Sequence, residues 1–217
     1  MQAPGWDRDL TRSRLEGGNS AAYCDPVVAE ELSKTFDGAQ ALKGLSLRAR
    51  EGEIFGLLGP NGAGKTTALH ILMGIIEPDG GRVSILGLCP FSQAYEVRSR
   101  INFCSAYVQL PFNLPVRGNL DIFARLYGVP DPAARVQELL ETFQLEGFSA
   151  KQTGSLSAGE QTRLNLAKCL LNDPAVLFLD EPTASLDPDM AHSVRDVLRR
   201  LKRERRMTIV YTSHNMA

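Results

Sequence analysis

The sequence predicts an α/β protein with a parallel-sheet core, an N-terminal antiparallel β subdomain and an inserted α-helical subdomain. Three observations support this prediction. Short strand-like runs follow one another closely from residue 27, separated by the turn pairs Asp37-Gly38 and Glu51-Gly52. Apolar residues recur at three- and four-residue spacings over most of 116–171, as they do in amphipathic helices. Strand-like and helix-like runs then alternate toward the end of the chain, which is the pattern of a parallel sheet.

The expected elements follow in order along the chain. The expected strands are 27–32, 41–47, 53–58, 82–86, 175–179 and 207–211, with a further apolar stretch from Ile101. The expected helices are 65–74, 93–98, 119–127, 133–143 and 188–203. The early strands are expected to form the antiparallel sheet and to lead into 54–58 as a central strand. Residues 1–25 are polar and lack periodicity, so they are expected to be a mobile leader before one domain at 26–217, with its helical subdomain at about 110–172.

Composition argues against several classes of function. The 217 residues carry a net charge of −1, so bulk charge attracts the chain neither to nucleic acid nor to anionic lipid. The four cysteines are far apart and form no CxxC pair, which favours reduced thiols over disulfides or a zinc site. No apolar run approaches the roughly 20 residues that span a bilayer. If the protein works at a membrane, another chain must supply the membrane-spanning part.

A phosphate-binding loop is the clearest motif in the chain. Residues 59 to 66 match G-x-x-x-x-G-K-[ST] in full, between an expected strand and an expected helix. Small residues let consecutive backbone N–H groups turn toward phosphate oxygens, and the following helix directs its positive end at them. Lys65 is expected to contact the β- and γ-phosphates, and Thr66 is expected to ligate Mg²⁺. The alternative is a glycine-rich turn that contains a lysine by chance, which the strand before the motif and the helix after it disfavour. The expected nucleotide-binding residues here are Gly59, Pro60, Asn61, Gly62, Ala63, Gly64, Lys65, Thr66 and Thr67.

An acidic pair follows the most apolar strand. Residues 175–179 are all apolar, and Asp180 and Glu181 come directly after them. A run that is apolar on both faces belongs to a central parallel strand, and catalytic residues collect at the carboxyl ends of such strands. Asp180 is therefore expected to hold Mg²⁺ and Glu181 to polarise a water for attack on the γ-phosphate. The alternative is a solvated acidic turn, which the phosphate loop disfavours.

A second anion-binding motif opens the last helix of the helical subdomain. Residues 156–161 read Leu-Ser-Ala-Gly-Glu-Gln, with Ser157 as N-cap and Glu160 three residues later. This arrangement is a capping box, which by itself explains a helix start. It also closely resembles the signature of ABC proteins, usually Leu-Ser-Gly-Gly-Gln, which precedes an Asp-Glu strand. The resemblance covers roughly residues 27 to 217 and implies a P-loop NTPase with a RecA-like core, in which Ser157, Gly159 and Glu160 contact nucleotide.

Other parts of the chain follow the order of the same family. Residues 185–187, which end in Asp187, resemble the D-loop, and His214 resembles the switch histidine that contacts the γ-phosphate. Phe36 stands where the family stacks an aromatic ring on adenine. One element departs from the pattern: the family usually has a metal-contacting glutamine at a place that corresponds here to Ser105 and Ala106. Gln109 is the nearest glutamine, so either the loop is shifted and Gln109 serves as a metal ligand, or this contact is absent.

The resemblance implies a working mechanism and partners. Two chains, arranged head to tail as a homodimer or a paired ABC ATPase, would sandwich ATP and Mg²⁺ between the phosphate loop of one and the signature of the other. Residues 123–129 and the region of Gly87 resemble ATPases of ABC-2-type exporters. The expected protein is therefore the ATP-hydrolysing motor subunit of an exporter, cytoplasmic and held at the inner face of the cell membrane by a transmembrane permease. Family members usually continue beyond the position of Ala217, so a truncated C-terminus is expected.

Two other functions compete with this interpretation. A soluble ABC ATPase acting on ribosomes or DNA usually carries two modules or long coiled coils, and neither is seen here. The basic residues of 195–206 are interrupted by Asp196 and Glu204 and lack interleaved aromatic residues, which is typical of a solvated helix, so no nucleic-acid partner is expected. A nucleotide-binding module that does not hydrolyse is disfavoured by Glu181.

Overall fold

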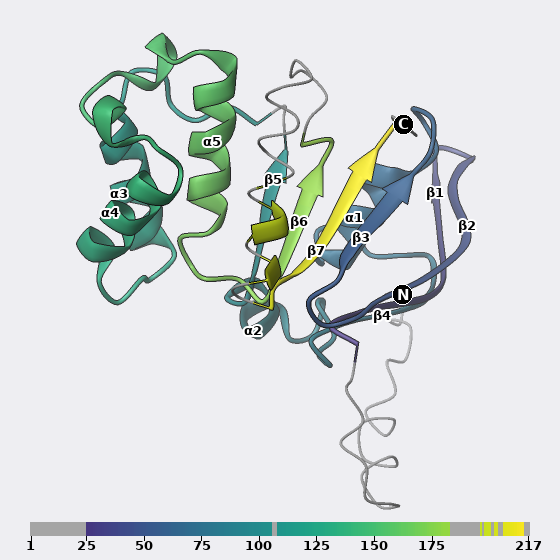
Figure 1. Ribbon diagram of the computed structural model, residues 1–217. Coiled ribbons are helices and arrows are strands. Elements are labelled where there is room, and N and C mark those ends of the chain that lie inside the picture. Colours follow the sequence, from purple (N-terminus) through teal and green to yellow (C-terminus); the bar gives the residue numbers. More distant parts are fainter. Residues whose placement is uncertain are drawn as a thin grey trace, which may run out of the picture.

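Two sheets organise the protein, as Figure 1 shows. The computed structural model describes residues 25–105, 108–182, 196, 198–200, 202–203 and 206–214. Residues 1–24 of the expected leader and Asp187 lie outside these residues, as does most of the expected helix 188–203. One sheet is antiparallel, with strand order β2-β1-β4, and the other is parallel, with order β3-β7-β6-β5. This arrangement confirms the predicted α/β class with an N-terminal antiparallel part.

The antiparallel sheet begins with a tight hairpin. Strand β1 (Val27–Phe36) and strand β2 (Ala39–Ala49) are joined by Asp37 and Gly38, and Phe36 pairs with Ala39. Both turn residues have positive φ, 47° and 81°, which matches the right-handed twist of the two strands and favours Asp-Gly at these positions. Strand β4 (Gly80–Ile85) pairs along the other side of β1.

The parallel sheet places the phosphate-loop strand at its edge. Strand β3 (Ile54–Leu58) pairs with β7 (Thr208–Ser213), which pairs with β6 (Val176–Asp180), which in turn pairs with β5 (Ile101–Ser105). The expectation that 54–58 is a central strand was wrong: among the described strands it pairs with β7 alone. The reason is the path of the chain, which leaves β3 through helix α1 (Lys65–Leu72) and enters the antiparallel sheet as β4.

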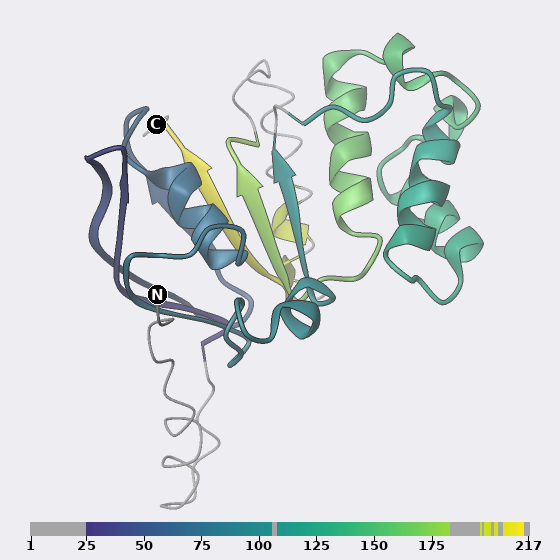
Figure 2. The same ribbon diagram turned by 180° about the vertical axis from the view of Figure 1, so that it is seen from behind.

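Apolar side chains cover both faces of the parallel sheet. Strand β6 is buried along its whole length, as predicted for a central strand. Val176 and Phe178 face a core shared with α1 and the antiparallel sheet, while Leu177 and Leu179 face a second core shared with the helical subdomain. Figure 2 shows α1 between the two sheets. Burying both faces of β6 fixes its place in the middle of the sheet, because a one-residue slip would exchange the two sets of side chains.

The helical subdomain stands beside β5. It contains α3 (Val116–Leu126), α4 (Pro132–Thr142), the short 3₁₀ helices η2 (Glu146–Phe148) and η3 (Thr153–Ser155), and α5 (Ala158–Cys169). A shorter helix, α2 (Ala94–Arg98), precedes β5. Helix α4 starts with Asp131 as N-cap, whose side chain accepts from the N–H of Ala134, and Pro132 in the first turn.

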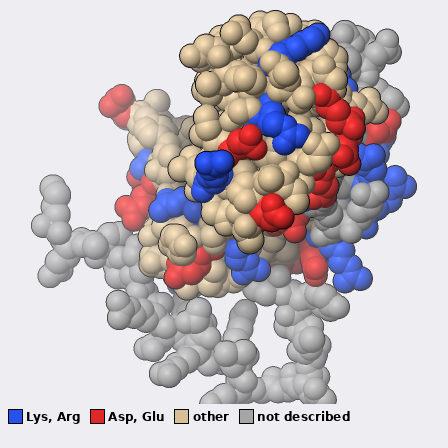
Figure 3. All heavy atoms as spheres, turned by 90° about the vertical axis from the view of Figure 1, so that its left-hand side faces the viewer, with Lys and Arg blue, Asp and Glu red and all other residues tan. Residues whose placement is uncertain are grey.

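The outer surface of the helical subdomain is mixed in charge. Figure 3 views it from the left of Figure 1 and shows basic and acidic side chains interspersed on the described atoms of this face. The basic helix near 199 is similar: Arg199 pairs with Asp196 at 3.0 Å, and Arg200 donates to the carbonyl of Thr142. Within the described residues, no helix is both long and apolar enough to cross a membrane.

Candidate nucleotide-binding site

The phosphate loop lies between the end of β3 and the start of α1. Gly62 and Gly64 have φ values of 80° and 82°, a conformation that residues with a Cβ rarely adopt. A Cβ on Gly64 would also lie 2.3 Å from the carbonyl oxygen of Ala41, so a larger residue cannot fit without moving β2. The N–H of Gly59 donates to the carbonyl of Ser213 at 3.2 Å, which ties the loop to the neighbouring strand. The loop shape therefore depends on both sheets.

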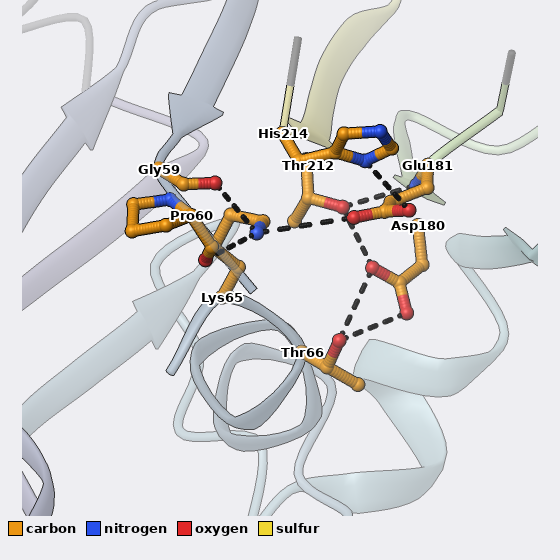
Figure 4. Close-up of polar contacts among 8 residues, drawn as sticks. All are labelled: Gly59, Pro60, Lys65, Thr66, Asp180, Glu181, Thr212 and His214. Atoms are coloured by element: carbon orange, nitrogen blue, oxygen red, sulfur yellow. Dashed lines mark hydrogen bonds and ion pairs between the residues drawn. The ribbon is translucent and has the colours of Figure 1, made fainter. Parts of the chain in front are cut away.

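Lys65 is the buried cation of the site. Its side chain is 7% exposed, and its Nζ donates to the carbonyls of Gly59 and Pro60 at 2.8 and 2.9 Å. The same nitrogen lies 3.8 Å from Oε1 of Glu181. Figure 4 shows Lys65 reaching across the loop toward the acidic pair. These partners are oxygen acceptors, so the ammonium can exchange them for the oxygens of a phosphate.

Asp180 joins the phosphate-loop helix to the end of β6. Its carboxylate is buried and accepts from the hydroxyl of Thr66, at 3.3 Å for Oδ1 and 3.1 Å for Oδ2. Thr212 donates to Oδ1 from the adjacent strand β7 at 2.6 Å. The hydroxyl of Thr66 and the carboxylate of Asp180 are hard oxygen donors, which is the chemistry Mg²⁺ prefers. No cluster of three or more His, Cys, Asp or Glu suited to a metal occurs in the described part of the chain.

Glu181 lies between two potentially cationic side chains. Its φ is 50°, and its N–H donates to the hydroxyl of Thr212 at 3.0 Å, so strand β7 fixes the turn that follows β6. Its carboxylate is 11% exposed; Oε1 faces Lys65, and Oε2 lies 3.1 Å from Nδ1 of His214. The His214 side chain is 45% exposed at the end of β7 (Figure 4). A carboxylate held in this way can accept a proton at the edge of the cavity.

The side chains of Lys65, Asp180 and Glu181 border a cavity of about 380 Å³. All but one of its lining residues belong to the phosphate loop or the acidic pair predicted from the sequence. The exception is Ala41 on β2 of the antiparallel sheet. Nothing in the sequence indicates that this residue lies against the phosphate loop. Thr212 was also missed, because its hydroxyl meets Asp180 from 32 positions away along the chain. The cavity is lined by Ala41, Asn61, Gly62, Gly64, Lys65, Thr66, Thr67, Asp180 and Glu181.

The signature lies elsewhere on the same chain. Ser157 caps α5: its hydroxyl accepts from the N–H of Glu160 at 3.4 Å, and Oε2 of Glu160 accepts from the N–H and hydroxyl of Ser157 at 2.7 and 2.8 Å. These bonds from Ser157 lower the pKa of Glu160 below its usual 4.5. Ser157 is exposed, Glu160 is half-buried, and Gly159 is buried. In Figure 1 α5 stands beside β5, at the opposite edge of the sheet from β3.

Two further predicted residues do not line the cavity, and a third lies outside the described residues. Phe36 ends β1 and is 41% exposed, with Nζ of Lys34 5.5 Å from the centre of its ring. Gln109 is exposed in the segment between β5 and α3, so the structure does not bring its side chain to Thr66 and Asp180. Asp187 lies outside the described residues. Their roles stay predictions.

The fold and the loop together define a class of protein. A phosphate loop between β3 and α1, with an acidic pair at the end of β6, belongs to the P-loop NTPases. Residues 42–184 match the family model described as ABC transporter. The chain belongs to the ABC transporter family.

Curated relatives and a solved structure support this assignment. The chain is 44% identical over 193 residues to the Nod factor export ATP-binding protein I of Burkholderia pseudomallei (strain 1710b), which covers 88% of this chain and 63% of that protein. It is 43% identical over 177 residues to the daunorubicin resistance ATP-binding protein DrrA2 of Streptomyces coeruleorubidus, covering 81% of this chain and 55% of the relative. The chain thus spans less than two thirds of the length of these relatives. The structure of cbiO1 from Clostridium perfringens, part of the ABC transporter complex cbiONQ, has a TM-score of 0.81 at 30% identity and covers 88% of this chain and 79% of cbiO1.

Proposed function

We propose that this chain binds ATP with Mg²⁺ and hydrolyses it as the motor of a membrane exporter. The observation that supports this most directly is the convergence of Lys65, Thr66, Asp180 and Glu181 on one cavity. The curated relatives are named for Nod factor export and daunorubicin resistance, which supports an export function. The substrate that this protein's transporter carries is not specified by any residue of this site.

Nucleotide binding rests on the phosphate loop. The N-cap of helix α1 is Gly64, which has no side chain that could bond the first N–H groups of the helix. These N–H groups and the positive end of the helix bind phosphate oxygens, and Lys65 exchanges the carbonyls of Gly59 and Pro60 for the β- and γ-phosphates. Phe36, exposed at the rim of the antiparallel sheet, stacks on the adenine in this proposal.

The donor set at Thr66 and Asp180 fits Mg²⁺. Two oxygen donors from the protein leave the other positions for substrate phosphates and water, which is how this ion is usually bound at phosphate sites. When bound, the ion neutralises charge that develops on the transferred phosphoryl group. Thr212 holds Asp180 through a 2.6 Å hydrogen bond and so fixes the direction of its carboxylate. Gln109 joins this set only if its segment moves toward the cavity.

Hydrolysis is assigned to Glu181. Its carboxylate accepts a proton from water as the water oxygen attacks the γ-phosphorus. The bond between the γ-phosphorus and the bridging oxygen breaks, and that oxygen leaves with ADP. The bond from the N–H of Glu181 to Thr212 and the 3.1 Å contact with His214 hold the carboxylate in place. Lys65 and His214 both face Glu181, and in this proposal substrate binding redistributes these contacts.

The signature is assigned to the second chain of a head-to-tail dimer. Ser157, Gly159 and Glu160 stand beside β5 rather than at the cavity, so they meet nucleotide only across an interface. Asp187 is assigned to the same interface by the family resemblance. A transmembrane permease holds the dimer at the inner face of the membrane and supplies the path for the exported molecule.

Glu181→Gln tests the catalytic assignment. The amide keeps the shape of the side chain but is a far weaker proton acceptor, so we expect ATP hydrolysis to fall by about 10²-fold or more while ATP binding persists. Steady-state phosphate release and equilibrium nucleotide binding measure the two effects. The matched control is Glu77→Gln, an exposed acid that does not line the cavity. Near-normal turnover by Glu181→Gln would remove Glu181 from its role.

Capture from membranes tests the transporter assignment. A tagged form of the protein is purified from detergent-solubilised membranes of its source cells, and the co-purifying proteins are identified by mass spectrometry. A polytopic membrane protein in near-equal amount is the expected result. Recovery of ribosomes or nucleic acid instead would favour a soluble ABC ATPase and leave the nucleotide site unaffected.

A further inference from the structure

A short ladder of hydrogen bonds joins two loops of the helical subdomain. We call it the loop ladder; it consists of residues 111–117 and 149–154. The N–H of Thr153 donates to Leu114 and that of Gly154 to Phe112, at 2.9 and 3.0 Å. In the other direction the N–H of Val116 donates to Lys151 and that of Arg117 to Ser149, both at 3.0 Å. A Cβ on Gly154 would lie 3.1 Å from Cβ of Phe112, so the two loops are closely packed.

The two sides of the loop ladder lead to different functional segments. Residues 111–117 follow β5, whose last residue Ser105 is paired with Asp180 of the nucleotide cavity. Residues 149–154 end three positions before Ser157 of the signature. Helix α5 also contacts the chain just before the first segment, because Asn165 donates to the carbonyl of Val108 at 3.4 Å. The loop ladder therefore lies on the covalent path between the cavity edge and the signature.

Asn119 joins the two sides with one side chain. It lies on α3 and is 1% exposed. Its Nδ2 donates to the carbonyl of Pro111 at 3.0 Å and to the hydroxyl of Thr153 at 2.8 Å. The carbonyl of Pro111 can only accept, which fixes the orientation of the amide. The two hydrogens of one planar group thus set the position of one loop relative to the other.

Packing alone is a poor reason for an amide at this position. The neighbouring residues Val116, Leu120 and Ala124 on the same helix are fully buried and apolar. Oδ1 of Asn119 is buried without a hydrogen-bond partner among the described residues. A buried acceptor left unpaired destabilises the fold, whereas an apolar side chain would pack there without that cost. What the amide supplies is a fixed register between the loops.

We propose that Asn119, acting through Thr153, is a positioning residue for ATP hydrolysis. It holds the loop that follows β5 and the loop that precedes Ser157 as one unit, so that a change at the nucleotide cavity moves the signature. This inference rests on the proposed function, because it assigns Ser157 a part in turnover. Neither residue touches nucleotide, and neither is assigned a chemical step.

Thr153→Val and Thr153→Ser form a matched pair of variants. Valine keeps the shape of threonine and removes the hydroxyl that accepts from Asn119, while serine retains the hydroxyl. We expect ATP binding to be unchanged in both, and kcat to fall about 10-fold in the valine variant only, as a displaced catalytic group predicts. Thermal unfolding of each variant is measured alongside. If kcat of the valine variant is normal at temperatures well below its unfolding temperature and falls only near that temperature, the role of Thr153 is purely structural and the proposal is overturned.

Hydrogen exchange supplies a second measurement that does not need turnover. In the Glu181→Gln background, amide exchange of residues 108–114 and 149–157 is compared with and without ATP and Mg²⁺. We expect both segments to respond with threonine or serine at 153, and the response of 149–157 to be at least halved with valine. Equal responses in the valine and serine variants would refute the inference. Failure of the unmodified protein with its membrane partner to hydrolyse ATP would refute the proposed function, and the exchange data would still decide the coupling.

Discussion

The phosphate loop and the signature both lie at the N-terminus of a helix, but the two helices are capped differently. At α1 the N-cap is Gly64, which bonds no N-terminal amide through a side chain. At α5 the N-cap is Ser157, which with Glu160 closes a complete capping box. The first helix therefore presents free N–H groups to a ligand, while the second already satisfies part of its own.

Burial differs between the two sites as well. Lys65 and Asp180 are 7% and 6% exposed. The phosphate loop holds Lys65, and side chains on α1 and β7 hold Asp180. Ser157 is exposed and Glu160 is half-buried, and their capping contacts come from within one turn of α5. A buried cation surrounded by preset acceptors is ready to receive an anion, whereas an exposed helix end is weak until a second surface covers it. The comparison teaches that the phosphate loop has its partners within one chain, whereas the signature, in the proposed function, meets nucleotide only when a second chain covers it.

The largest expected effect that follows from this comparison concerns Lys65. Lys65→Ala removes the buried cation and its charge-assisted hydrogen bonds, so we expect ATP affinity to fall on the order of 100-fold. Titration with a fluorescent ATP analogue measures this change in the single chain. Lys43→Ala serves as the control, since Lys43 is exposed on β2 and does not line the cavity. If both variants bind equally well, the phosphate loop is not the principal binding site.

A smaller effect is expected at the signature. Ser157→Ala should leave ATP binding by one chain unchanged and lower turnover roughly 10-fold, because the altered group meets nucleotide only across the interface. Loss of the cap lowers the free energy of unfolding by about 1 kcal/mol, which thermal unfolding checks.

Mixing two impaired chains sharpens the same comparison. A Lys65→Ala chain retains an intact signature, and a Ser157→Ala chain retains an intact phosphate loop. Head-to-tail pairing of the two restores one complete site, so the mixture should turn over ATP faster than either variant alone. Simple additivity of the two rates would contradict the shared site.

The smallest expected effect is a pH dependence of the capping box. Hydrogen bonds from Ser157 lower the pKa of Glu160 below 4.5 in the folded protein, so its contribution to stability is present above that pH and is lost as the pH falls through the lowered pKa. Glu160→Gln should thus be less stable than the unmodified protein at pH 7, with the difference shrinking as the pH falls below 4.5. Urea unfolding at several pH values measures it. Glu51→Gln, in an exposed turn, provides the comparison, and a constant difference across the range would argue against the capping role.

Contiguous motifs were predictable because their chemistry is local. A phosphate loop binds with consecutive backbone groups, so residues 59–66 carry their own geometry in the sequence. The capping box of Ser157 and Glu160 lies within one helical turn and was likewise visible. The apolar run of β6 predicted a strand buried on both faces, which the structure confirms.

Contacts between distant segments were not predictable in the same way. Asp180 meets Thr66 across 114 positions of the chain, and Thr212 joins them from a third segment. Asn119 looked like one more polar position on an amphipathic helix, and only the structure places it between Pro111 and Thr153. Neither periodicity nor spacing reports which loops lie side by side.

The sequence by itself determined the class of fold, the phosphate loop and the type of chemistry at the acidic pair, because each depends on residues within a few positions of one another. The tertiary structure decided that β3 lies at the edge of the described sheet, that Ala41 closes against Gly64, and that the signature stands apart from the cavity. These facts depend on strand order and on the packing of whole subdomains. Strand order is fixed by the combined burial of many distant side chains, and no single stretch of sequence contains that information.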